Sequence, residues 1–390
     1  MTKPLSSSGP SEHWDIFCTV IDNYGDIGVT WRLAKQLVHD FGIEVRLWVD
    51  DLNSFAHILP GLDVTLSRQE IMAVRIYHWR QPLAEQWQAG DVLIEAFACN
   101  LPASVLDQLV SLDKPPRWLN LEYLSAEGWI DSCHGLPSLQ SNGVSKHFYF
   151  PGFTPSSGGL LCEHGLFEQR DKWQGDPANR ARLLQGLNIE GVSSEDTLVS
   201  VFSYESSALL SLCQSWRQAN KRVHALIPMG PSLNSLLTLF PDGLGLMPGD
   251  SLTLDSLTLH ILPMTDQHAY DRLLWSCDFN IVRGEDSFIR AQWAAKPFIW
   301  HIYAQEDDAH LDKLSAFSNL YIDSLDADTG QTWSMLNLAF NQEDGETTAK
   351  MWWKLHERRT FMDKHAVKWP MLALNHADLA TRLVQFIKKG

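Results

Sequence analysis

The feature that most constrains the fold is an alternation of short apolar runs with longer amphipathic runs, which occurs twice along the chain. In the first half, apolar runs such as WDIFCTVID and DVLIEAFA are separated by helix-like runs such as LPASVLDQLVSL. Short strands that alternate with helices are typical of βαβ units, whose strands pair in parallel. The pattern begins again with TLVSVFSYE, after a stretch of turn formers and charged residues at 154–195. The sequence therefore predicts an α/β protein with two doubly wound, Rossmann-like domains and a cleft between them.

The same pattern gives the expected domain boundaries. Residues 1–13 read as a disordered lead-in, 14–170 as the N-terminal domain and 171–195 as a linker. Residues 196–365 read as the C-terminal domain, and 366–390 as a C-terminal helix that could pack back on the N-terminal domain. Two domains also suit a chain of 390 residues, because single hydrophobic cores stop growing well below that length.

Composition excludes several classes of protein. The net charge of −16 and the lack of long basic runs argue against nucleic acid as a partner, because phosphate contacts need clustered Lys and Arg. No run approaches the ~18 apolar residues of a membrane span, and the start MTKPLSSSGPSEH lacks the apolar core of a signal peptide. The six cysteines form no CxxC pair, which favours free thiols over zinc sites or disulfides. We therefore expect a cytoplasmic protein.

The turn VIDNYGDIG, residues 20–28, joins a predicted strand to a predicted helix and contains two carboxylates, Asp22 and Asp26. Gly25 and Gly28 supply only part of the G-x-G-x-x-G dinucleotide fingerprint. Two acids would also repel a pyrophosphate from this helix start, so the turn favours a cationic guest over NAD. The alternative for Asp26 is an ordinary helix N-cap, which leaves Asp22 without an explanation.

A second strand-to-helix turn lies within FNIVRGEDSFIRAQWAAKPFIW, residues 279–300. Asp286 or Ser287 could cap the helix, and the backbone amides at its start could receive phosphate oxygens. Arg283 offers a planar fork for a further phosphate contact, while Glu285 and Asp286 suit sugar hydroxyls. The alternative is an ordinary capped helix with a local Arg–acid pair.

Three residues before this turn could contact a nucleobase. Gln267 could read a pyrimidine edge, and Tyr270 or Met264 lies where a base could stack. Tyr204 ends the predicted strand LVSVFSY and faces the same alternatives. For the aromatic residues, ordinary core packing at helical spacing is the competing explanation.

Four segments resemble the EarP family of bacterial protein-arginine rhamnosyltransferases, which act on elongation factor P: WDIFCTVIDNYGDIGVTWRLAKQL, WLNLEYLSAEGW, FYFPGF and YDRLLWSCDFNIVRGEDSFIRAQWAAKPFIWHIYAQEDDAH. The resemblance covers essentially the whole chain after the first dozen residues. It implies a GT-B glycosyltransferase fold, an inverting mechanism without a metal or other cofactor, and dTDP-β-L-rhamnose as the donor. The product would carry α-L-rhamnose on one arginine of elongation factor P, which would activate it for the rescue of stalled polyproline translation.

The resemblance also implies roles for particular residues. It makes Asp22, Asp26 and Glu285 catalytic, and it assigns the acceptor arginine to the N-terminal domain and the nucleotide sugar to the C-terminal domain. The implied nucleotide-sugar contacts are Tyr204, Gln267, Tyr270, Arg283, Gly284, Asp286 and Ser287. On the acceptor side the implied residues are Asn23, Tyr24, Gly25 and Gly28.

The acid pair suits the chemistry of an arginine acceptor. A guanidinium has a pKa above ~12, so an enzyme must hold the cation and remove a proton as the new bond forms. We expect Asp26 to be the general base and Asp22 to orient the guanidinium, or the two roles to be exchanged.

Two alternative functions stay open. One is a transferase with a hydroxyl acceptor, or a sugar-nucleotide epimerase, on the same architecture; the other is a non-catalytic module that clamps an acidic or arginine-bearing partner.

Overall fold

The protein is described by a computed structural model that covers residues 13–21, 24–80, 83, 87–241, 244–374 and 377–389. The chain divides into two compact units. The first unit comprises residues 1–124, 129–164 and 376–390, and the second comprises residues 125–128 and 165–375. The predicted α/β class is confirmed, because each unit is built on one largely parallel sheet.

The sheet of the first unit has eight strands in the order β3-β4-β2-β1-β5-β6-β8-β7. The central strands are parallel, whereas the edge strands β3 and β7 are antiparallel to their neighbours. The strands are β1 (His13–Cys18), β2 (Glu44–Val49), β3 (Arg68–Ile71), β4 (Val74–His78), β5 (Val92–Ala96), β6 (Arg117–Leu121), β7 (Pro137–Leu139) and β8 (Ser145–Tyr149). Parallel pairing places the carboxyl ends of β1, β2, β5 and β6 along one edge of the sheet.

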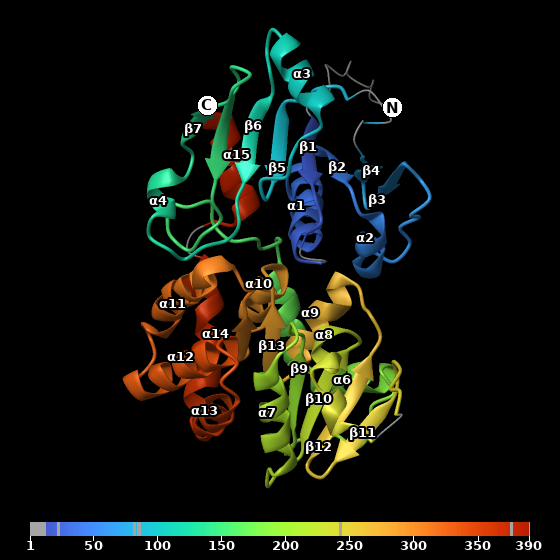
Figure 1. Cartoon of the computed structure of the whole chain (residues 1–390), viewed down its shortest axis with the longest axis vertical. Coiled ribbons are helices and arrows are strands. Elements are labelled where there is room, and N and C mark those ends of the chain that lie inside the picture. The colour runs from blue at the N-terminus through green and yellow to red at the C-terminus, as the bar shows by residue number, and fades with distance from the viewer. Residues whose placement is uncertain are drawn as a thin grey trace, which may run out of the picture. The chain divides into compact units, whose positions relative to one another are not determined.

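Helices pack on this sheet through apolar faces. They are α1 (Gly25–Phe41), α2 (Leu52–Ile58), α3 (Ala103–Ser111), α4 (Ile130–Cys133) and α15 (Leu379–Lys389). The last helix, red in Figure 1, packs beside α1 and returns the end of the chain to the first unit. Its Leu379 and Leu383 are buried in the same core as Ile16 of β1, and the Leu379 amide donates to the Leu160 carbonyl.

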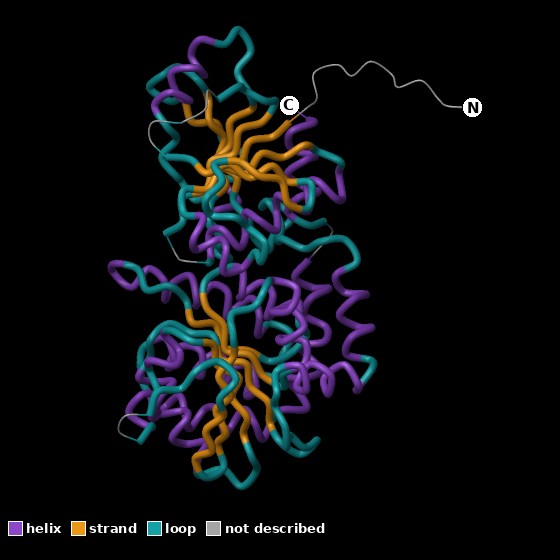
Figure 2. Tube along the Cα trace, turned by 90° about the vertical axis from the view of Figure 1, so that its right-hand side faces the viewer, coloured by secondary structure: helices purple, strands orange, loops and turns teal. Residues whose placement is uncertain are grey.

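The second unit has six strands in the order β11-β12-β10-β9-β13-β14, and only β11 runs antiparallel to its neighbour. In Figure 2 these strands form a central layer with helices on both sides. The strands are β9 (Thr197–Val201), β10 (Val223–Pro228), β11 (Ser251–Leu254), β12 (Leu257–Leu262), β13 (Phe279–Arg283) and β14 (Phe298–His301). The helices are α5 (Leu166–Gln174), α6 (Pro177–Gly186), α7 (Ser207–Arg217), α8 (Pro231–Asn234), α9 (Gln267–Ser276), α10 (Asp286–Trp293), α11 (Ala309–Ile322), α12 (Ala327–Asn341), α13 (Gly345–Glu357) and α14 (Arg359–Leu374), with short 3₁₀ turns at Leu237–Leu239 and Glu306–Asp308.

Two segments differ from the sequence-based expectation. Residues 171–195, expected as a linker, contain the end of α5 and all of α6. The turn formers in this stretch are a helix-start signal: the Asp176 carboxylate accepts from the Ala178 amide, and Pro177 occupies the first turn. Residues 366–390, expected as one helix, are the end of α14 and the separate helix α15.

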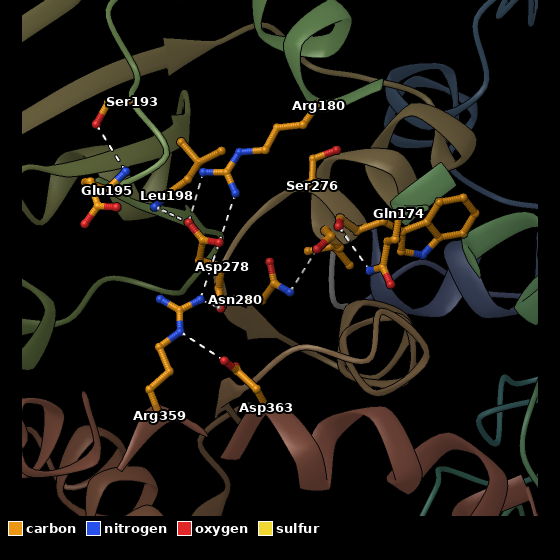
Figure 3. A network of polar contacts seen from close by, with 12 residues as sticks. Gln174, Arg180, Ser193, Glu195, Leu198, Ser276, Asp278, Asn280, Arg359 and Asp363 are labelled. Carbon is orange, nitrogen blue, oxygen red and sulfur yellow. Dashed lines mark hydrogen bonds and ion pairs between the residues drawn. The ribbon is translucent and has the colours of Figure 1, made fainter. Parts of the chain in front are cut away.

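The carboxylate of Asp278, just before β13, ties α6 into the second unit (Figure 3). It accepts two hydrogen bonds from Arg180, of 2.9 and 3.0 Å, and a third of 2.9 Å from the Leu198 amide. Arg359 of α14 adds an ion pair of 3.4 Å. Burial opposes ionisation of this carboxyl, but the hydrogen bonds and charge of Arg180, with the Leu198 amide and the Arg359 charge, hold the pKa of Asp278 below its usual value. The supposed linker is therefore an integral part of the second unit.

All six cysteines are free thiols, as the sequence predicts. In the parts of the chain that the structure describes, no helix combines the length and apolar character that crossing a bilayer requires.

Candidate active site

The acid turn of the first unit lies where β1 ends and α1 begins. Asp26, the second residue of α1, is only 1% exposed. Its Oδ2 accepts a hydrogen bond of 2.9 Å from the Ile21 amide, and its Oδ1 accepts one of 3.3 Å from the Tyr123 hydroxyl. The N-cap of α1 is Tyr24, so the reading of Asp26 as an N-cap is wrong. The structure instead presents Asp26 as a buried carboxylate with a donor on each oxygen.

Other predicted acceptor-side residues surround this helix start. The Tyr24 hydroxyl and Nδ1 of His57, from α2, are joined by a hydrogen bond of 3.3 Å, and their rings meet edge to face with centres 5.7 Å apart. Gly25 begins α1, and the Gly28 amide donates to the Tyr24 carbonyl. Two other predicted residues, Asp22 and Asn23, lie outside the described residues.

Asp50, which directly follows β2, supports the same turn. Its carboxylate accepts a hydrogen bond of 2.9 Å from the Val20 amide. Burial is the main reason that the pKa of Asp50 is raised above its usual value. The neighbouring Asp51 caps α2 by accepting from the amides of Asn53 and Ser54. The backbone that leads into the acid turn is therefore anchored to a second strand end.

In the second unit, Arg283 ends β13 and is held on three sides. Its Nη1 donates to the Ser203 carbonyl at 3.2 Å. The guanidinium carbon lies 4.4 Å from the ring centre of Phe202 and 4.9 Å from that of Tyr204. The ring of Tyr204 also contacts His301, which ends the neighbouring strand β14. Predicted residues Arg283 and Tyr204 thus lie together at the carboxyl edge of the second sheet, and the guanidinium is held against two aromatic rings and a carbonyl, an arrangement that we call the clamp.

The four residues after Arg283 make the turn into α10. Gly284 has a φ of +61°, which a residue without a side chain adopts readily, and its carbonyl accepts from the Trp300 indole. The N-cap of α10 is Glu285, so the expectation that Asp286 or Ser287 fills this position is wrong. Glu285 makes no side-chain capping bond; its carboxylate accepts from Lys313 of α11 at 3.3 Å.

Two of the predicted base-contacting residues, Gln267 and Tyr270, lie on α9, and Met264 precedes it. Gln267, its first residue, is buried, and Tyr270 lies one turn further on. The ring of Tyr270 meets the ring of Phe202 edge to face, with centres 5.8 Å apart, and burial raises the pKa of its phenol well above the usual value. Met264 is 39% exposed. Phe202, which sequence reasoning missed, therefore links Tyr270 to the clamped Arg283.

Three long helices start at the carboxyl edge of the second sheet, and a helix start favours anions. At α7 the Glu343 carboxylate already serves as the anion, because it accepts from the Ala208 amide at 3.1 Å and from the Ser207 hydroxyl and amide. At α9 the Asp266 side chain caps the helix. At α10 the N-cap side chain turns to Lys313 instead. Of these three helix starts, α10 is the one whose N-cap side chain makes no capping bond, although Glu285 and Asp286 place two acids there.

Among the residues that the structure describes, no group of three or more His, Cys, Asp or Glu side chains is arranged to hold a metal ion.

Comparisons with known proteins agree on one family. The model of the elongation factor P rhamnosyltransferase EarP family matches residues 14–388. A protein-arginine rhamnosyltransferase of Shewanella oneidensis is 58% identical over 99% of this chain and 100% of its own length. One from Pseudomonas aeruginosa is 45% identical over 96% of this chain and 98% of its own length.

Solved structures give the same answer for the fold. A structure described as the basis for EarP-mediated arginine glycosylation of translation elongation factor EF-P is 33% identical with a TM-score of 0.66, and the match covers 97% of this chain and 99% of that one. MurG of Acinetobacter baumannii, a GT-B glycosyltransferase, is 13% identical with a TM-score of 0.50 over 98% of this chain and 100% of its own, a likeness of fold alone. This chain therefore has the GT-B glycosyltransferase fold and belongs to the EarP family of protein-arginine rhamnosyltransferases.

Proposed function

We propose that this chain transfers L-rhamnose from dTDP-β-L-rhamnose to an arginine side-chain nitrogen of elongation factor P. The mechanism is inverting and uses no metal or other cofactor, and the product is activated for the rescue of stalled polyproline translation. The partners are elongation factor P and the nucleotide sugar, without nucleic acid or a membrane, and the compartment is the cytoplasm. The observation that carries the proposal is the buried Asp26 carboxylate at a helix start, where a phosphate would otherwise be favoured.

On the acceptor side, Asp26 meets the requirements of a base for a guanidinium. The Ile21 amide and the Tyr123 hydroxyl each donate to one oxygen of Asp26 and so orient the carboxylate. Carboxylates pair with guanidinium N–H groups in a strong and directional arrangement. Asp22 orients the cation from the same turn, or the two acids exchange these roles.

In the chemical step, the acceptor nitrogen attacks the anomeric carbon from the face opposite the diphosphate. The C–N bond forms as the C–O bond breaks, and the electron pair of that bond leaves with the diphosphate. Asp26 takes the proton that the nitrogen loses. Glu285 holds the rhamnose hydroxyls and is itself held by Lys313.

On the donor side, the diphosphate binds at the start of α10, at Gly284 and the first helical residues Asp286 and Ser287. Arg283 stabilises the charge that builds up on the leaving diphosphate, and its rigid clamping means that little reorganisation is needed during reaction. Gln267 contacts the pyrimidine edge, while Tyr204 and Tyr270 contribute aromatic surface for the nucleoside.

The proposal is tested by the intact mass of elongation factor P after incubation with this protein and dTDP-β-L-rhamnose, with chelator present and no added metal. A gain of one deoxyhexose, mapped to an arginine, is the expected result. Consumption of the donor without any gain on the protein would favour a different acceptor. An intact donor together with tight binding of elongation factor P would favour the non-catalytic module.

A further inference from the structure

Tyr123 connects the acid turn to the ends of β5 and β6, the two strands next to β1 on one side of the first sheet. It follows β6 by two residues, and its hydroxyl donates to Oδ1 of Asp26 at 3.3 Å. Its ring stacks on Phe97, which follows β5 directly, with ring centres 4.6 Å apart and an angle of 18° between the ring planes. The phenol is therefore located at both ends, by the stacked ring and by the carboxylate.

The backbone at Phe97 and Ala98 is strained. Phe97 and Ala98 have φ angles of +56° and +53°, a left-handed conformation that non-glycine residues rarely adopt. Such strain persists only where the surroundings enforce it, and it is concentrated at functional sites. Here β6 enforces it, because the Phe97 amide donates to the Leu121 carbonyl at 2.7 Å and the Ala98 amide donates to the Asn120 side chain at 3.1 Å.

We propose that Tyr123 is a positioning residue for Asp26, and that the strained turn at Phe97 exists to hold Tyr123 in place. The Ile21 amide holds one oxygen of Asp26 and Tyr123 holds the other, so the carboxylate cannot rotate about its own bond. The acceptor nitrogen then meets the base in one orientation. This inference rests on the proposed function, because it assumes that Asp26 acts on the acceptor arginine.

The test replaces Tyr123 by Phe, which removes the hydroxyl and keeps the stacked ring. We expect kcat for rhamnose transfer to fall roughly 10- to 100-fold, the size of a lost hydrogen bond to a charged group. The KM for elongation factor P should change much less, because the variant alters orientation rather than docking. An unchanged kcat would overturn the inference.

A matched control is Tyr149→Phe. Tyr149 is a buried tyrosine of the same unit whose hydroxyl also makes a hydrogen bond of 3.3 Å, to the Gly158 carbonyl. We expect wild-type kcat for this variant. An equal loss of kcat in both variants would mean that Tyr123 has only a structural role, and would also overturn the inference.

A double-mutant cycle identifies the partner through which Tyr123 acts. On the Asp26→Asn background, with rates measured at high enzyme concentration, Tyr123→Phe should add almost no further loss, because the group that it positions is already gone. Fully additive losses would contradict the inference. Should Tyr123→Phe fail to fold, Phe97→Leu tests the same link, since it keeps the phenol but removes its stacking partner and should also lower kcat.

The wild-type protein separates this inference from the proposed function. If the wild type transfers no rhamnose, the proposed function fails and the inference fails with it. If the wild type is active and Tyr123→Phe is equally active, the inference alone fails.

Discussion

The carboxyl edges of the two sheets have similar backbones and opposite chemistry. Each sheet has a parallel centre with a helix that starts directly after a central strand. In the first unit the strand-to-helix turn carries the buried carboxylate of Asp26, whereas in the second unit the strand before the helix ends in the clamped guanidinium of Arg283. The same backbone arrangement can therefore serve a cationic guest at one edge and an anionic guest at the other, and single residues at the helix start (Asp26) or the strand end (Arg283) decide which.

The largest expected effect comes from removing the acid of the first edge. We expect Asp26→Asn to lower kcat for rhamnose transfer by roughly 10³-fold, within the range for loss of a general base. The measurement is the initial rate of mass gain on elongation factor P. Asp63→Asn, in an exposed loop of the same unit, is the control and should be fully active. Near-normal turnover in Asp26→Asn would remove the acidic half of the comparison.

The next effect tests the basic edge. Arg283→Lys keeps the charge but loses the planar group that is held against Phe202 and Tyr204. We expect dTDP affinity to fall roughly 10- to 50-fold, measured by calorimetry, because a lysine cannot keep this orientation. Arg272→Lys is the control, since Arg272 also stacks on an aromatic ring, that of Trp173, but is exposed on α9. Equal affinity in Arg283→Lys and the wild type would show that the clamp does not serve the donor.

A smaller expected effect on kcat tests the role of Glu285 through its ion pair with Lys313. Lys313→Gln removes the cation that holds Glu285, and we expect kcat to fall about tenfold, with partial recovery in Lys313→Arg. The KM for the donor and kcat should be measured together. A loss that Lys313→Arg does not relieve would indicate a role of Lys313 outside this ion pair.

The smallest effect concerns the acid stability of the second unit. Burial lowers the pKa of His260, His301 and His365, all in the second unit, to about 4. Above pH 6.5 these rings are neutral whether the chain is folded or not. As the pH falls below 6.5, the unfolded chain binds protons that the folded chain does not, so stability is lost. From pH 7 to pH 6 each histidine should cost about 0.7 kcal/mol.

Urea unfolding of the second unit at the two pH values, in the wild type and in His365→Phe, measures this cost. The variant should lose about 0.7 kcal/mol less than the wild type over the same interval. An identical loss in both proteins would mean that His365 becomes protonated in the folded state near neutral pH.

Much of the order of strands and helices could be predicted from the sequence. The alternation of apolar and amphipathic runs correctly predicts two parallel sheets, and the position of the R-G-E-D-S turn correctly predicts the strand end and helix start at residues 283–287. The linker prediction at 171–195 was wrong because Asp176 and Pro177 serve a helix start as well as they would serve a loop. The N-cap readings failed for a related reason. Several polar residues in each turn could have capped the helix, and the choice among them depends on backbone angles that the residue types do not specify.

Local sequence specifies which chemical groups stand at each strand end, since a pattern of apolar and polar residues encodes a strand, a turn and a helix in order. Which of those groups meet depends on how the elements pack. The pairing of Tyr123 with Asp26, of Lys313 with Glu285, and of Glu343 with the start of α7 joins residues from 28 to more than 130 positions apart. Such pairs form because separate elements pack on one sheet, and no local pattern contains that information.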